Sequence, residues 1–133
     1  MKKFICLILC FCISVLFVGC DNENSESTVF EQKLTLVTMP SPPKCKTTDS
    51  ISDINKVLNV LGEIEKTPID DGVNGGWYFM IKLTVDGSTV NYTVGGVFTD
   101  ADGKQYNVEN WEYIKERLTD IYVEIDAEEV DYT

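Results

Sequence analysis

Residues 77–94 read WYFMIKLTVDGSTVNYTV, two alternating segments joined by Asp86-Gly87, and they predict the centre of the fold. Alternation places the apolar residues of the first segment on one face, as in a half-buried strand: Trp77, Phe79, Ile81, Leu83 and Val85. Asp-Gly between two such segments is typical of a two-residue hairpin turn. We therefore predict an antiparallel hairpin. Its returning strand continues the buried face through Val90, Tyr92, Val94 and Phe98, with Gly95-Gly96 as a bulge or bend.

The opposite face of the first strand carries Tyr78, Met80, Lys82 and Thr84. If helices cover only the apolar face, Tyr78 and Met80 form an exposed mixed patch of the kind that interfaces favour. Ordinary antiparallel sheets also show such residues to solvent, so the alternative is a solvated face without a partner. An edge strand that accepts another strand is a further route to a partner.

Two helices are predicted from apolar spacing of three and four residues. The first covers residues 50–61, with Ser50 as N-cap and Gly62 as C-terminal cap. Its stripe consists of Ile51, Ile54, Val57, Leu58 and Leu61. The second begins near Asn110, and its stripe consists of Trp111, Ile114, Leu118 and Ile121.

The remaining segments complete one small domain. We predict a strand over residues 33–39 that the Pro-rich loop 40–43 stops, a long mobile loop over 63–76, and a turn at 100–103 before a short strand through Tyr106 and Val108. Residues 122–126 fit either a short edge strand or the end of the helix. The order β-α-β-β-β-α gives an α+β two-layer sandwich, an antiparallel meander with both helices on one face.

The N-terminus has the features of an export signal. Lys2 and Lys3 precede an uncharged, apolar run over residues 4–18, which ends in Val18-Gly19-Cys20. The run is short for a permanent membrane span and fits a secretory signal better. With its tail Leu16-Phe17-Val18-Gly19-Cys20 the segment resembles the signal of bacterial lipoproteins. The alternatives are an uncleaved apolar anchor and an ordinary cleaved signal.

The lipoprotein resemblance implies cleavage after Gly19, with diacylglycerol and an N-acyl lipid on Cys20 and no other cofactor. It divides the chain into a signal (1–19), a lipidated cysteine with a flexible tether (20–32), an α+β domain (33–126) and a solvated acidic tail (127–133). The expected location is the extracytoplasmic face of the cell membrane, where acyl chains act as an anchor. The sequence leaves a Gram-positive and a Gram-negative host equally open.

The charge and cysteine content limit which partners and which covalent bonds we expect. The chain has 11 basic and 22 acidic residues; loss of Lys2 and Lys3 leaves 9 basic residues and a net charge of −13. Nucleic acid is therefore not expected as a partner, because phosphate contacts need basic patches. Of the five cysteines, only Cys45 would keep a thiol after processing, so no intramolecular disulfide is expected. We expect Cys45 to be a small, partly buried apolar residue.

No catalytic constellation is evident. The chain has no histidine, which removes Ser-His-Asp and Cys-His catalysis. Asp100, Asp102, Gly103 and Glu109 match positions 3, 5, 6 and 12 of a calcium loop, but Phe98 occupies position 1, where a ligand is needed. A hairpin turn explains the same residues, so these three acids remain weak candidates for a metal. Acid–base catalysis by two carboxylates needs side chains that face each other, whereas adjacent acids such as Asp70 and Asp71 point apart. We therefore expect no enzymatic activity.

Short motifs across the domain give a second resemblance: residues 39–43 (MPSPP), 46–49 (KTTD), 76–78 (GWY) and 102–106 (DGKQY). Together they resemble small uncharacterised lipoproteins of Firmicutes, a likeness that implies no activity or ligand. We therefore expect a non-enzymatic binding or interaction module that is anchored to the membrane and has an envelope protein as its candidate partner. The alternatives are a sensor of a small ligand or cation through the loops around Asp70 and Asp100, and an envelope protein without a specific ligand.

Overall fold

The computed structural model describes residues 31–39, 41–73 and 75–133. Within them lie two helices and one antiparallel sheet of eight strands in the order β3-β7-β6-β5-β4-β1-β2-β8. The predicted α+β class with an antiparallel sheet is confirmed, but the sheet has more strands than expected. The predicted signal, Gly19, Cys20 and most of the tether lie outside the described residues. None of the helices in the described part of the chain is long and apolar enough to cross a membrane.

The elements follow one another in this order: β1 (Gln32–Thr38), β2 (Lys44–Thr48), α2 (Ile51–Gly62), β3 (Lys66–Pro68), β4 (Phe79–Val85), β5 (Ser88–Val94), β6 (Val97–Thr99), β7 (Gln105–Val108), α3 (Trp111–Glu124) and β8 (Val130–Asp131).

The central hairpin is β4–β5, as predicted. Val85 pairs with Ser88, so Asp86 and Gly87 alone make the turn, with φ angles of 49° and 81°. Two consecutive positive φ values define the turn type that matches strand twist, and glycine adopts them without a steric cost. This turn sets the register by which Ile81 faces Tyr92 and Phe79 faces Val94.

The returning strand does not continue through Phe98. The chain reverses at Gly95-Gly96, and β6 pairs back onto β5 with Phe98 opposite Val94. The predicted burial of Val94 and Phe98 is confirmed, but instead of a bulge or bend within one strand the two glycines make a complete reversal into a new strand. Gly95 has no room for a side chain, since a Cβ there would lie 2.9 Å from the backbone oxygen of Gly76.

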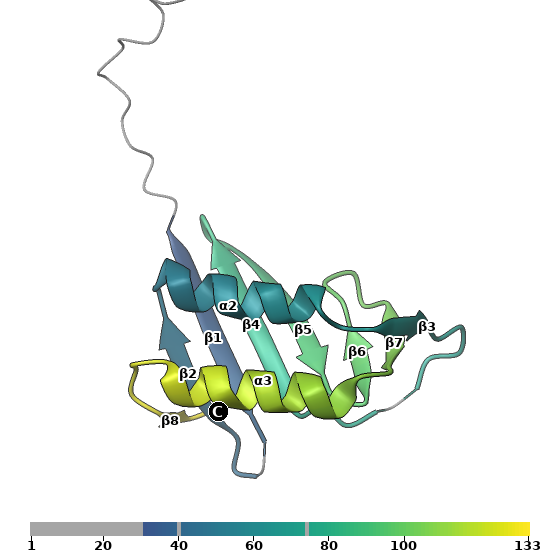
Figure 1. The fold of residues 1–133 in the computed structure, drawn as a ribbon. Coiled ribbons are helices and arrows are strands. Elements are labelled where there is room, and N and C mark those ends of the chain that lie inside the picture. The colour runs from purple at the N-terminus through teal and green to yellow at the C-terminus, as the bar shows by residue number, and fades with distance from the viewer. Residues whose placement is uncertain (1–30, 40, 74) are drawn as a thin grey trace, which may run out of the picture.

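Helices α2 and α3 contact each other and run across the same side of the sheet (Figure 1). The α3 stripe is confirmed at its buried positions Ile114, Leu118 and Ile121. The stripe of α2 is rotated from the prediction. It buries Ile54, Val57 and Val60, whereas the side chains of Ile51 and Leu58 are 66% and 37% exposed.

The ends of α2 are set by local capping. Ser50 caps the helix as predicted, and its Oγ accepts a hydrogen bond from the backbone N–H of Asp53 at 3.3 Å. Gly62 lies inside the helix, and Glu63 is the C-terminal cap.

Three short strands were not predicted. β2 follows the Pro-rich loop, β3 lies within the predicted mobile loop, and β8 lies within the predicted acidic tail. β3 pairs with β7, and β8 pairs with β2. Since α3 continues to Glu124, the helical alternative for residues 122–126 is the better description. The domain therefore includes residues that the sequence assigned to a solvated tail.

Candidate functional site

The side of the sheet turned away from the helices carries mostly polar side chains. Residues that pair across neighbouring strands share a face, and Met80 pairs with Val37 on one side and Thr93 on the other. Phe79 and Ile81, which flank Met80, are buried in the core beneath the helices. We call the opposite side the open face, and its central residues are Thr35, Val37, Cys45, Thr47, Met80, Lys82, Thr84, Thr89, Asn91, Thr93 and Thr99.

Threonine hydroxyls pair across this face. Thr35 Oγ1 lies 2.9 Å from Thr47 Oγ1, and Thr84 Oγ1 lies 2.8 Å from Thr89 Oγ1. Each hydroxyl has one donor and two acceptor positions, so a pair keeps unused capacity for a ligand. Asn91 is exposed on the neighbouring strand β5. The arrangement can form hydrogen bonds with a polar partner over several strands.

Two residues of the open face are nevertheless buried. Val37 is 0% and Cys45 is 6% exposed, although neither belongs to the core cluster beneath the helices. Tyr132 lies against the same part of the sheet: its hydroxyl is 3.7 Å from the sulfur of Met80, and the Lys82 Nζ is 4.7 Å from its ring centroid. The open face therefore has a small apolar patch of its own, next to the side chain of the penultimate residue.

Tyr78 does not join Met80 on the open face. Its ring packs against the core, with its centroid 5.8 Å from that of Trp111 and 5.1 Å from the Nζ of Lys115 on α3. Tyr78 precedes the first residue of β4, so strand alternation does not fix its side chain. Of the two residues that sequence analysis proposed for an interaction face, only Met80 lies there.

Residues 127–133, which we call the C-terminal segment, are attached to the sheet. Asp131 forms an ion pair with Lys44, and the backbone N–H of Tyr132 donates to the carbonyl of Pro43 at 2.9 Å. Upstream, the Tyr122 hydroxyl donates to Glu129 at 2.8 Å. These contacts hold β8 against the outer edge of β2.

Basic groups gather at this corner of an acidic protein. Lys44 of β2 and Lys82 of β4 lie beside Asp131 and Tyr132. Lys46 lies on the helix side, where its Nζ donates to the Ile125 carbonyl at 3.0 Å. The hydrogen bond to Asp131, together with its charge, raises the pKa of Lys44 above its usual value. Burial raises the pKa of the Cys45 thiol, and the charge of Lys82 only partly opposes this effect. Cys45 is thus a protonated, shielded thiol at neutral pH, in agreement with its expected role as a small apolar residue.

Two of the three acids considered for calcium accept hydrogen bonds within the fold. Asp100 Oδ1 accepts backbone N–H groups of Asp102 and Lys104, and its Oδ2 accepts the Tyr106 hydroxyl. Burial acts to raise the pKa of Asp100, but these donors outweigh it and lower the pKa. Glu109 follows β7, whose four extended residues span ~13 Å, and it accepts a hydrogen bond from Thr67. Over the described ranges no three acids, histidines or cysteines are placed to hold a metal ion.

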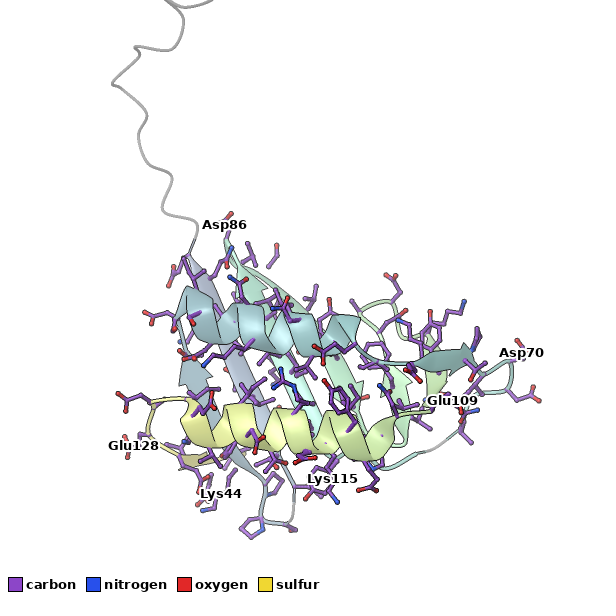
Figure 2. All side chains as sticks on the ribbon, in the orientation of Figure 1. Lys44, Asp70, Asp86, Glu109, Lys115 and Glu128 are labelled. Atoms are coloured by element: carbon purple, nitrogen blue, oxygen red, sulfur yellow. The ribbon has the colours of Figure 1, made fainter. Side chains whose placement is uncertain are left out.

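The other acidic loops lie far apart and do not form a common site. Figure 2 shows Asp70 at the tip of the loop beyond β3, pointing away from the sheet, while Glu128 lies at the opposite end of the molecule near Lys44. The loop that carries Asp70 is tied to β7, because the Gln105 side-chain amide exchanges two hydrogen bonds with the backbone of Val73.

A shallow pocket of about 430 Å³ lies where the chain enters β1. Its polar lining includes Glu31, Asp49 and Asp126, with Lys33 among them. It adjoins the open face at Thr47 and lies close to the end of the expected tether.

Sequence reasoning missed the part that the C-terminal segment plays at this site. Acidic residues precede Tyr132, and their charge indicated a solvated tail. The only available signal was the alternation of Val130 and Tyr132 across Asp131, which is too short to predict a strand. In the comparisons with known proteins, no family model, curated protein or solved structure matches the chain.

Proposed function

We propose that the chain is a lipid-anchored, extracytoplasmic binding module without enzymatic activity, and that its open face contacts a protein of the cell envelope. The observation that carries the proposal is the open face itself, a polar surface built on β1, β2, β4, β5 and β6. The two helices cover the other side of the sheet. The open face is therefore the side that a partner can reach.

The predicted anchor supports this assignment. The segment that ends in Gly19-Cys20 has the composition of a lipoprotein signal. The described chain enters the sheet at Gln32, beside the Asp86-Gly87 turn, where the Asp86 N–H donates to the Glu31 carbonyl at 3.1 Å. Gln32 therefore lies at the end of a strand, next to the hairpin turn.

The site chemistry fits binding better than catalysis. Hydroxyl and amide groups dominate the open face, and the thiol of Cys45 is protonated and shielded. Threonine and asparagine side chains supply donors and acceptors for recognition but need an activating base for covalent chemistry. Asp100 accepts hydrogen bonds from its own turn and Glu109 accepts one from Thr67, so the sensor alternative has less support.

Cross-linking in intact cells tests the proposal with the full chain and three variants. Asn91→Arg places a bulky charge on the open face, Asn55→Arg places the same charge on the exposed side of α2, and Cys20→Ala removes the expected lipid site. We expect one discrete partner with the unmodified chain and with Asn55→Arg, and loss of that partner with Asn91→Arg and Cys20→Ala. Equal recovery with Asn91→Arg and Asn55→Arg would contradict a role of the open face.

A further inference from the structure

The sheet ends in a strand that is shorter than the edge it covers. β8 pairs through Val130 and Asp131 with only two of the five residues of β2, Cys45 and Lys44. In Figure 1, β8 lies beside β2 close to the C-terminus, beyond the loop that follows α3. The rest of β2, from Lys46 to Thr48, has no ladder partner from β8 on this side.

The C-terminal segment contacts the sheet in the manner of an added peptide strand. Its backbone pairs with an edge, while successive side chains reach separate sites: Val130 opposite Cys45, Asp131 on Lys44, and Tyr132 on Met80 and Lys82. Main-chain pairing combined with sites for individual side chains is how an edge strand recognises an extended ligand.

The site has a defined chemical preference. Lys44 and Lys82 are cationic in a chain whose formal net charge is −11, so this corner favours an acidic ligand over a basic one. An aromatic ring packs favourably against both groups: the ammonium of Lys82 attracts its face, and the sulfur of Met80 often contacts its edge. An extended ligand with an acidic residue followed by an aromatic one satisfies both preferences.

The segment is held by contacts that a ligand could replace. The side chains of Lys44 and Asp131 are 42% and 64% exposed, and such surface ion pairs contribute little. Val130 is 46% exposed, so it buries only part of its apolar surface. A ligand strand that forms the same contacts and buries more apolar surface than Val130 does would have an advantage over the two residues of β8.

We propose that the outer edge of β2, together with Lys44, Met80 and Lys82, is a docking site for an extended peptide of another protein that carries an acidic residue followed by an aromatic residue. The C-terminal segment occupies this site until such a peptide displaces it. The inference deepens the proposed function by naming a kind of partner, and it rests on the chain being a binding module.

The test uses the full chain in detergent and the same chain ending at Asp126, with a fluorescent peptide of residues 127–133, AEEVDYT, as the probe. Fluorescence anisotropy should show at least tenfold tighter binding to the shortened chain, because the full chain carries its own competitor. Peptides with Asp131→Lys or Tyr132→Ala should bind at least fivefold more weakly than AEEVDYT. Failure of a folded shortened chain to distinguish AEEVDYT from a scrambled peptide overturns the proposal.

A second measurement covers the case in which the shortened chain does not fold. In the full chain with Cys6, Cys10, Cys12 and Cys20 replaced by serine, Cys45 is the only thiol. We expect Asp131→Lys combined with Tyr132→Ala to raise its alkylation rate at least tenfold, whereas Glu116→Lys on the exposed side of α3 leaves the rate unchanged. An unchanged rate in the double variant overturns the proposal.

Sedimentation of the full chain identifies the competing occupant. A monomer agrees with the proposal, whereas a dimer that dissociates when residues 127–133 are removed would assign the edge to a second copy and overturn it. None of these measurements depends on lipidation or on an envelope partner in cells, so their failure would leave the cross-linking result with Asn91→Arg to stand independently.

Discussion

The placement of Tyr132 on the sheet predicts a measurable coupling with Lys82. The Lys82 ammonium lies 4.7 Å from the centroid of the Tyr132 ring, within the distance at which a cation and an aromatic ring attract each other. Contacts of this type contribute about 0.5–1 kcal/mol at exposed sites. In a domain of about 100 residues, that coupling corresponds to roughly 2–8 °C in the thermal midpoint.

A double-mutant cycle isolates this contribution. Lys82→Met keeps most of the alkyl chain without the charge, and Tyr132→Leu keeps an apolar side chain without the ring. We expect the two substitutions together to cost less than the sum of the two separate costs, by about 0.5–1 kcal/mol in urea unfolding. Lys82→Met combined with Tyr113→Leu is the control, because Tyr113 lies on α3 and the two changes should add.

A coupling below about 0.3 kcal/mol, the scatter of independent sites, would refute the reasoning. It would mean that the C-terminal segment does not lie on the sheet in solution. The burial of Val37 and Cys45 would then need another explanation.

Three further predictions concern the turns and the titrating groups. Gly95→Ala should lower the thermal midpoint markedly, because the added Cβ would lie 2.9 Å from a backbone oxygen, whereas Gly96→Ala, with nothing within 4 Å, should have little effect. Since the pKa of Asp100 is lowered on folding, its stabilising effect is present above the unfolded value of 3.8 and is lost as pH falls through the folded value. The difference in midpoint between the unmodified chain and Asp100→Asn should therefore shrink below about pH 3.8, and a constant difference from pH 6 to pH 2 would contradict this. Burial and the hydrogen bond to Glu129 raise the pKa of Tyr122, so stability is retained below pH 10 and falls as pH rises further; Tyr122→Phe should reduce that alkaline loss in urea titrations at pH 8 and pH 11.

The central hairpin could be predicted because local chemistry and tertiary packing agree there. Asp86-Gly87 favours the observed turn, and the alternation around it matches the face that the helices cover. The same agreement identified α3, whose apolar stripe matches its buried residues.

The short outer strands could not be predicted because backbone pairing defines them more than side-chain pattern does. β3 consists of Lys66, Thr67 and Pro68, which are all exposed, and its pairing with β7 leaves no apolar alternation in the sequence. β2 has only Cys45 as an apolar residue. The phase of α2 was also undetermined, since Ile54-Val57-Val60 and Ile51-Leu58-Leu61 both have helical spacing, and packing against α3 and the sheet selects between them.

The candidate site was partly predictable for the same reason. Alternation within β4 placed Met80 on the open face, but it did not apply to Tyr78 just before the strand. The contribution of Tyr132 depends on a contact between residues 52 positions apart, which no local pattern encodes.

Mass spectrometry of the mature N-terminus tests the central claim, membrane anchoring through Cys20, most directly. The protein would be isolated from membranes of its own host, with Cys20→Ala expressed in parallel. We expect an N-terminal peptide that begins at Cys20 and carries diacylglycerol, and an unlipidated Cys20→Ala protein. A mature chain that retains residues 1–19, or that begins elsewhere without a lipid, would contradict it.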